Sequence, residues 1–401
     1  MPRHRVWPLY VGGFLGPYGS TMVTPMVHEV AEGLRSTPET AATAVTVYML
    51  PFAALMLLSG TLAERWGRGR VLQLALAGFV VATALCALAP SMRFFLAARV
   101  LQGATNAFTT PLMVAAISDL VPSRRLGRAL GWFAAAQAAG QGVSPVITGA
   151  SAAAHWRLAF LVPGLCALVL CALPPSREAT RRTAESRASW RELANRRLAL
   201  GCAVAFLCYL AAVGLTVLAV LRGHDRFGLG PLELGLLSAV FGCAGIAGAS
   251  LVGPGMARWG VAPFGLVANL ALLGGLLAAA LGPSLWVMAP GIALVGLAVT
   301  GLRSVTNTLA VTSAPGNRAG AASLAMSAQF FGGACAPPLW MATYDRWGDW
   351  GFAATALAPL VALAVLTSVT RRASRTSRAS APGPGAPASD GVRPTSPSAP
   401  T

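Results

Sequence analysis

Side chains that could do chemistry are few in this sequence, and most lie outside its long apolar runs. The 13 carboxylates all fall near the ends of those runs or between them, and none falls at the middle of one. The seven cysteines lack the spacing of a metal site, and the four histidines are scattered. We therefore expect no metal, no cofactor and no enzyme, because a membrane enzyme would need clustered His, Asp or Cys.

Two arginines stand inside apolar runs. Arg99 lies in the segment LAARVLQG at 96–103, and Arg303 lies in the run 285–309. A charge inside a bilayer is costly and indicates a functional role by default. Either guanidinium could instead reach the membrane surface along its own aliphatic stem. Arg303 could face an anionic substrate, or its side chain could extend to the cytoplasmic surface.

Uncharged polar side chains also occur within the runs. They can line a substrate cavity, or they can bond one helix to another. The candidate cavity residues are the uncharged Tyr48, Asn106, Gln137, Gln141, Tyr209, Asn307 and Gln329, together with the charged Arg303. Because their neighbours are apolar and no acid is central, we expect neutral or amphipathic substrates rather than strongly cationic ones.

The apolar runs that carry these residues have the length of membrane spans. The chain is 55% hydrophobic and 11% charged, whereas a soluble protein of 401 residues needs more charge on its surface. About 20 residues of helix cross the roughly 30 Å of a bilayer's hydrocarbon. Such runs lie near 8–30, 42–62, 71–89, 94–117, 127–150, 156–174, 198–221, 232–253, 263–282, 285–309, 318–342 and 350–369. The expected fold class is an all-α polytopic membrane protein with 12 transmembrane helices.

The distribution of arginine predicts how these spans are oriented. All 30 basic residues are Arg, and with a cytoplasmic N-terminus 22 lie in inside segments, 6 in outside loops and 2 within spans. Positive residues favour the cytoplasmic side, so we expect both termini inside the cell (inner) membrane, with an uncleaved first span. The net charge of +17 does not indicate nucleic-acid binding, because the arginines form short clusters between apolar runs.

An internal repeat divides the chain into two halves. With an offset of 193 residues, Pro122 aligns with Pro315 and Arg125 with Arg318, and the segment at 253–260 resembles that at 60–67. Paired halves are typical of secondary transporters, which bind substrate between them. The predicted organisation is a six-helix bundle at 1–174, a cytoplasmic linker at 175–197, a second bundle at 198–370 and a disordered tail at 371–401.

The loop between the second and third spans reads GTLAERWGRGR. Its glycines allow a tight turn and its arginines favour the cytoplasmic face. The spacing resembles the signature loop of the major facilitator superfamily, with Glu in place of the usual Asp. The resemblance implies a conformational latch that closes the inner side, formed by Gly60, Glu64, Arg65, Gly67, Arg68, Arg70 and, at the end of the fourth span, Asp119.

Two further motifs resemble that superfamily. Arg99, Gln102 and Gly103 match its fourth-span motif, which is associated with proton transfer, and Arg99 could alter the proton affinity of a neighbouring carboxylate. The carboxylates available are Glu29 and Glu32 at the end of the first span, or Asp119; the alternative for Glu29 and Glu32 is simple exposure to solvent. The fifth span resembles the motif of the 12-spanning drug:proton antiporter branch at Gly131, Gly140, Ser144, Pro145 and Gly149, although Ser144 and Thr148 replace two glycines.

These resemblances imply a secondary active transporter that exports small hydrophobic or amphipathic compounds in exchange for protons by alternating access. An uptake symporter or a facilitator on the same fold is the alternative. The expected partners are the lipid bilayer, a small-molecule substrate and protons, and the expected state is a monomer.

Overall fold

The structure is a computed structural model, and it describes residues 7–172 and 190–367. These residues form helices and the turns between them, without strands. The first half contains α1 (Trp7–Gly12), α2 (Leu15–Thr21), α3 (Val27–Gly33), α4 (Pro38–Trp66), α5 (Arg68–Ala87), α6 (Met92–Asn106), α7 (Thr109–Leu120), α8 (Ser123–Ala154) and α9 (Leu161–Ala172). The second contains α10 (Arg196–Phe227), α11 (Pro231–Trp259), α12 (Val261–Leu281), α13 (Leu285–Ser313), α14 (Arg318–Trp347), α15 (Asp349–Ala353) and a helical segment at 357–367.

Each of the twelve predicted spans falls on a helix or on a run of short helices, which confirms the predicted fold class. Seven helical segments within the described residues are individually long and apolar enough to cross a membrane. The first span is divided into α1, α2 and α3, with a 3-10 turn that contains Pro25 before α3. The fourth is divided into α6 and α7. Short polar caps begin several spans: the side chains of Thr37, Ser91 and Asn195 each accept a hydrogen bond from the first turn of α4, α6 and α10.

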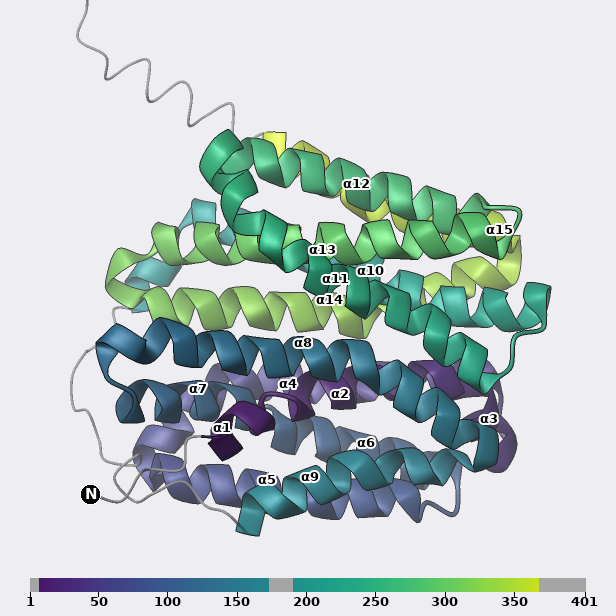
Figure 1. Cartoon of the computed structure of the whole chain (residues 1–401), viewed down its shortest axis with the longest axis horizontal. Helices are drawn as coiled ribbons and strands as arrows, with labels where there is room; N and C mark the ends of the chain where they lie inside the picture. The colour runs from purple at the N-terminus through teal and green to yellow at the C-terminus, as the bar shows by residue number, and fades with distance from the viewer. Residues whose placement is uncertain (1–6, 173–189, 368–401) are drawn as a thin grey trace, which may run out of the picture.

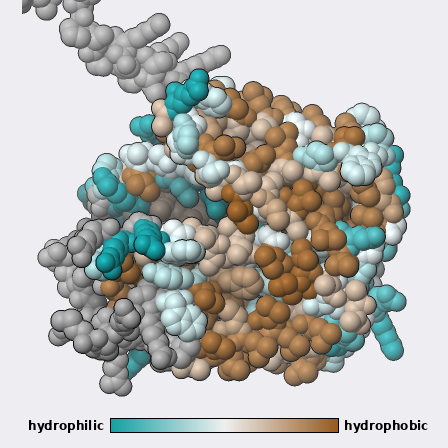
Figure 2. All heavy atoms as spheres, in the orientation of Figure 1, coloured by the Kyte–Doolittle hydropathy of each residue, from teal (hydrophilic) through white to brown (hydrophobic). Residues whose placement is uncertain are grey.

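The helices form two bundles that lie side by side, with α8 beside α11 and α4 beside α14 at the junction (Figure 1). The surface in the same orientation shows apolar side chains across its middle and hydrophilic side chains gathered mainly toward its two ends (Figure 2). An apolar band between polar ends is what a bilayer requires of a helical bundle.

The two halves repeat a backbone conformation as well as a sequence pattern. Gly67 ends α4 with φ of 89°, and Gly260, 193 residues later, ends α11 with φ of 83°. L-residues with a side chain rarely adopt this conformation, so glycine is required at both turns. The predicted tail and most of the predicted linker lie outside the described residues.

Candidate functional site: a central cavity between the two halves

A cavity of about 630 Å³ lies between the two bundles. Its walls come from α2, α4, α7 and α8 of the first half and from α10, α13 and α14 of the second. The wall is largely apolar, with Phe52, Phe133, Met326 and Phe330 among its larger members. Apolar walls with a few convergent polar groups are typical of sites for small molecules.

The polar part of this wall contains most of the candidate cavity residues. They are Gln137, Gln141, Tyr209, Arg303, Asn307 and Gln329. Arg303 lies within hydrogen-bonding reach of the Tyr209 side chain. Among the described lining residues, Arg303 carries a charge and none is a carboxylate, so the cavity is electropositive. The amide oxygen Oδ1 of Asn307 is buried without a hydrogen-bond partner, so it is available to a donor on a ligand.

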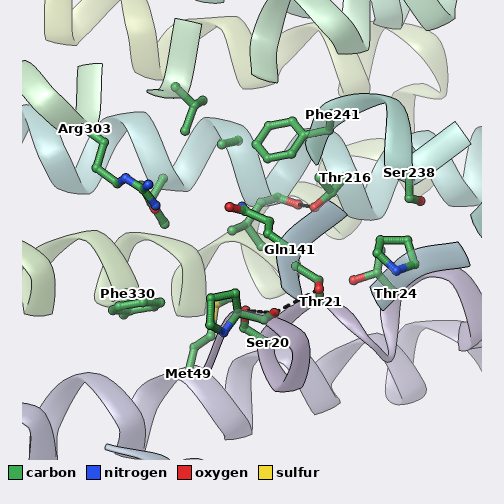
Figure 3. Close-up of a pocket in the computed structure, with 16 residues that line it drawn as sticks. Ser20, Thr21, Thr24, Met49, Gln141, Thr216, Ser238, Phe241, Arg303 and Phe330 are labelled. Atoms are coloured by element: carbon green, nitrogen blue, oxygen red, sulfur yellow. Dashed lines mark hydrogen bonds between the residues drawn. The ribbon is translucent and has the colours of Figure 1, made fainter. Parts of the chain in front are cut away.

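A smaller pocket of about 90 Å³ adjoins the cavity and shares Gln141, Tyr209 and Arg303 with it. Arg303 and Phe330 lie on one side of this pocket, and Thr24 and Ser238 lie on the other (Figure 3). Several lining hydroxyls were not among the candidate residues. Those of Ser20 and Thr21 donate to the backbone oxygen of Pro17, so they add polarity to the wall while their protons are already paired.

Tyr48 and Asn106 lie elsewhere, in a buried network around Arg99. The Arg99 guanidinium lies 4.2 Å from the centroid of the Tyr48 ring, and the Asn106 amide donates to the Tyr48 hydroxyl. Arg99 is fully buried, so it does not extend to the membrane surface. It donates to the backbone oxygens of Gly19 and Ala44 at 3.0 and 3.4 Å.

The two other residues of the fourth-span motif complete this network. Gln102 accepts from Arg99 through Oε1 and donates to the hydroxyl of Thr83 through Nε2 at 2.9 Å. At Gly103, a Cβ would lie 2.0 Å from the backbone oxygen of Tyr48, so glycine lets α6 approach α4. The motif therefore binds α2, α4, α5 and α6 together around a buried cation.

The fifth-span motif lies on α8 and packs on two neighbours. Gly140 lies against the backbone of Phe14, and the Ser144 hydroxyl donates to the backbone oxygen of Tyr18 at 3.1 Å. Gly149 lies against α11 of the other half, where its Cβ would come within 2.4 Å of the backbone oxygen of Pro231. A Cβ at Gly131, by contrast, would meet no atom within 4 Å.

The bundle has two distinct ends. We name the end that carries Arg65, Arg68 and Arg70 the arginine-rich end, and the end that carries His28 and His224 the histidine end. The cavity wall lies toward the arginine-rich end, because it includes Met56 on α4, Val114 on α7, Leu130 on α8 and Ser323 on α14. Toward the histidine end, α8 and α11 are in close contact, because a Cβ on Gly235 would lie 2.4 Å from the backbone oxygen of Pro145.

Other candidate residues lie away from the cavity or outside the described part of the chain. Glu29 and Glu32 belong to α3 at the histidine end and do not line it. Arg65, Gly67, Arg68 and Arg70 lie at the junction of α4 and α5. The structure does not describe the side chains of Glu64 and Asp119 or the surroundings of Gly60, so the predicted latch stays a prediction.

The family model of the Major Facilitator Superfamily matches residues 9–281 and 224–397. The chain belongs to this superfamily. It is therefore a multi-pass membrane protein of a transporter family, and that family is not one of enzymes. This membership accounts for the cavity between two six-helix halves.

Named relatives match part of the chain. It is 36% identical over 150 residues to the multidrug efflux pump LfrA of Mycolicibacterium smegmatis, covering 36% of this chain and 29% of that protein. It is 28% identical over 167 residues to the uncharacterized MFS-type transporter YceJ of Bacillus subtilis, covering 42% of this chain and 43% of that one. The chain thus aligns with less than half the length of these curated relatives.

Solved structures resemble the chain over most of its length. A bacterial homolog of the human lysosomal transporter Spinster, crystallised in an inward-facing and unoccupied conformation, aligns with a TM-score of 0.70 at 19% identity, covering 91% of this chain and 96% of that one. A point mutant of the nucleoside transporter NupG aligns with a TM-score of 0.70 at 12% identity, covering 90% of this chain and 97% of that one. At these identities the likeness concerns the fold.

Proposed function

We propose that the chain exports small amphipathic compounds, neutral or anionic, across the cell membrane in exchange for protons. The observation that carries this proposal is the cavity of about 630 Å³, with its largely apolar wall and Arg303. Apolar lining favours hydrophobic cargo, and a guanidinium favours a negative group and disfavours a cation. The partial match to a multidrug efflux pump and the fifth-span motif support export as the direction.

Alternating access is the mechanism that this arrangement supports. With the arginine-rich end in the cytoplasm, as the arginine distribution predicts, the cavity lies toward the inner side and the α8–α11 contact closes the outer side. Cargo would enter from the cytoplasm or the inner leaflet. Separation of α8 from α11, with closure near the 60–70 loop, would then release it outside. We also propose that the two bundles, the linker and the tail have the limits predicted above. The transporter is then a monomer with both termini in the cytoplasm.

Proton coupling would use the buried network around Arg99. Its bonds to Gly19 and Ala44 join α2, which contributes Pro17 to the cavity wall, to α4. A shift of α2 would change the surroundings of this cation and, through electrostatics, the proton affinity of a nearby carboxylate. Glu29, Glu32 and Asp119 remain the candidate proton carriers.

The test is transport into inverted membrane vesicles with an imposed proton gradient. A panel should contain an anionic, a neutral and a cationic amphipathic dye of similar size. Uptake of the anionic and neutral dyes that collapses with a protonophore supports the proposal. Uptake that persists at full rate with a protonophore indicates a facilitator, and uptake in right-side-out vesicles driven by an inward gradient indicates a symporter. Either result overturns proton-coupled export.

A further inference from the structure

The histidine end holds a cluster of metal-binding side chains that joins the two halves. His28 belongs to α3 of the first half, whereas His224 and Asp225 belong to the last turns of α10 in the second. One ligand atom from each of these residues lies within 4.8 Å of the other two. The sequence separation between the halves hides this proximity, which is why the spacing of the histidines did not predict a metal site.

The two imidazole rings face each other and have nitrogen atoms available. The centroids of His28 and His224 are 3.9 Å apart, with an interplanar angle of 28°. The Nδ1 atom of His28 is buried without a hydrogen-bond partner, whereas Nδ1 of His224 lies 3.4 Å from the backbone oxygen of Leu229 and leaves Nε2 free to bind elsewhere. A buried nitrogen without a partner costs free energy, and a metal ion would provide that partner.

The composition of the cluster selects the class of ion. Two imidazoles and a carboxylate are ligands for Zn²⁺ and similar divalent transition metals, whereas Ca²⁺ and Mg²⁺ prefer oxygen ligands alone. Tetrahedral Zn²⁺ needs ligand atoms roughly 3.4 Å apart, given bonds of about 2.0–2.1 Å. The rings must therefore turn out of their stacked arrangement. The exposed side chains of His224 and Asp225 have room to do so.

A fourth ligand is available in the same place. The Oε2 atom of Glu29 is buried without a hydrogen-bond partner, and its carboxylate is close enough to His224 for their charges to interact. A fourth position could equally be filled by water, as in zinc sites with three protein ligands.

We propose that His28, His224 and Asp225 form a Zn²⁺ site that bridges the two halves at the histidine end, and that the ion stabilises the conformation in which this end is closed. An ion bound across the junction interacts with the closed conformation and loses a ligand when the halves separate there. The bound ion therefore shifts the equilibrium toward the closed conformation, by an amount set by the difference between its affinities for the closed and the open conformations. The binding site stands on the geometry alone, whereas its effect on transport rests on the proposed alternating access.

The binding test uses the full chain, purified in detergent without a histidine tag and freed of metal. Calorimetric titration with Zn²⁺ is expected to give one ion per chain. His28→Ala and His224→Ala should each weaken the affinity at least about tenfold, a loss of 1.4 kcal/mol or more. His155→Asn is the matched control. His155 caps a 3-10 helix through Nδ1, and Asn retains that cap while removing an imidazole that is not part of the His28–His224–Asp225 cluster.

Cobalt provides a readout that is independent of stability. Co²⁺ bound at the site should give visible absorption bands of tetrahedral coordination in the wild type and in His155→Asn, and lose them in His28→Ala. An equal Zn²⁺ affinity in all three histidine variants, or bands that persist in His28→Ala, would overturn the site.

The transport test addresses the conformational effect separately. Zn²⁺ should inhibit transport by the wild type and by His155→Asn, and inhibit His224→Ala only at concentrations at least about tenfold higher. Site-dependent binding without inhibition retains the site and overturns its effect on conformation. Absence of transport in every variant without metal contradicts the proposed function instead and leaves the binding result standing.

Discussion

Gly103 on α6 lies directly against the backbone oxygen of Tyr48 on α4, where a Cβ would come within 2.0 Å of that oxygen. The second half contains the same contact 193 residues later, because a Cβ on Gly296 would lie 2.1 Å from the backbone oxygen of Phe241. A glycine contact that recurs at the offset of the sequence repeat links the repeat to helix packing, since small residues let membrane helices approach closely.

Substitution of either glycine should therefore destabilise the helix pair to which it belongs. We expect Gly103→Ala and Gly296→Ala each to lower the free energy of unfolding by about 1–3 kcal/mol, because the added methyl group displaces backbone. The measurement is the thermal unfolding midpoint in detergent. Gly131→Ala is the control, because a Cβ there meets no atom within 4 Å. Equal midpoints for Gly103→Ala and Gly131→Ala would show that α6 and α4 are not in close contact.

Two variants of Tyr48 can separate the hydrogen bond that its hydroxyl accepts from Asn106 from the cation–π contact that its ring makes with Arg99. Tyr48→Phe retains the ring but leaves the Asn106 amide without its acceptor, so we expect a loss of about 1–2 kcal/mol. Tyr48→Leu also removes the ring beneath the guanidinium, which should add about 1–2 kcal/mol. Chemical or thermal unfolding of both variants measures the difference. If Leu and Phe were equally destabilising, the cation–π contact would contribute nothing.

Arg303 should determine the charge of the cargo. Arg303→Gln removes the positive charge from the described cavity wall, and we expect export of an anionic dye to fall about 10- to 100-fold, as for loss of a charge-assisted hydrogen bond. Arg303→Lys should retain more of this transport because it keeps the charge. A neutral dye of similar size is the internal control, and its transport should change little. Equal loss for both dyes would assign Arg303 a structural role.

The carboxyl of Asp345 should make stability depend on pH. It lies near the end of α14, beyond the predicted span at 318–342, where partial burial and then the negative charges of Glu39 and Asp225 raise its pKa. A group whose pKa is raised on folding stabilises the fold at acidic pH, and this contribution is lost as pH rises through the folded-state pKa.

The corresponding variant is Asp345→Asn. Its unfolding midpoint should equal that of the wild type at pH values below the unfolded-state pKa of the carboxyl and exceed it slightly above the raised folded-state pKa. The difference should be small because the side chain is still largely exposed. Midpoints measured across a pH series, with matched ionic strength, test this. A difference of constant size at every pH would contradict it.

The sequence predicted the elements of this fold better than the directions of its side chains. Run length and arginine placement are properties of whole segments, and they suffice to predict twelve spans. Whether a polar residue within a span faces a cavity depends on the rotation of its helix against its neighbours. Gln141 and Tyr48 both lie within predicted spans, yet Gln141 faces the cavity and Tyr48 lies under Arg99. The pairing of His28 with His224 depends on how the two halves dock, which no local pattern encodes.

The charge of Arg303 has a consequence for how the membrane voltage acts on the transporter. An empty carrier would present a positive cavity, whereas a carrier loaded with a monoanion would present a neutral one. With the orientation proposed above, an inside-negative potential favours the empty cavity in electrical contact with the cytoplasm, by up to about 2.3 kcal/mol per 100 mV. The resting carrier is then held open toward the compartment from which it collects its cargo, and loading with an anion releases it from that bias.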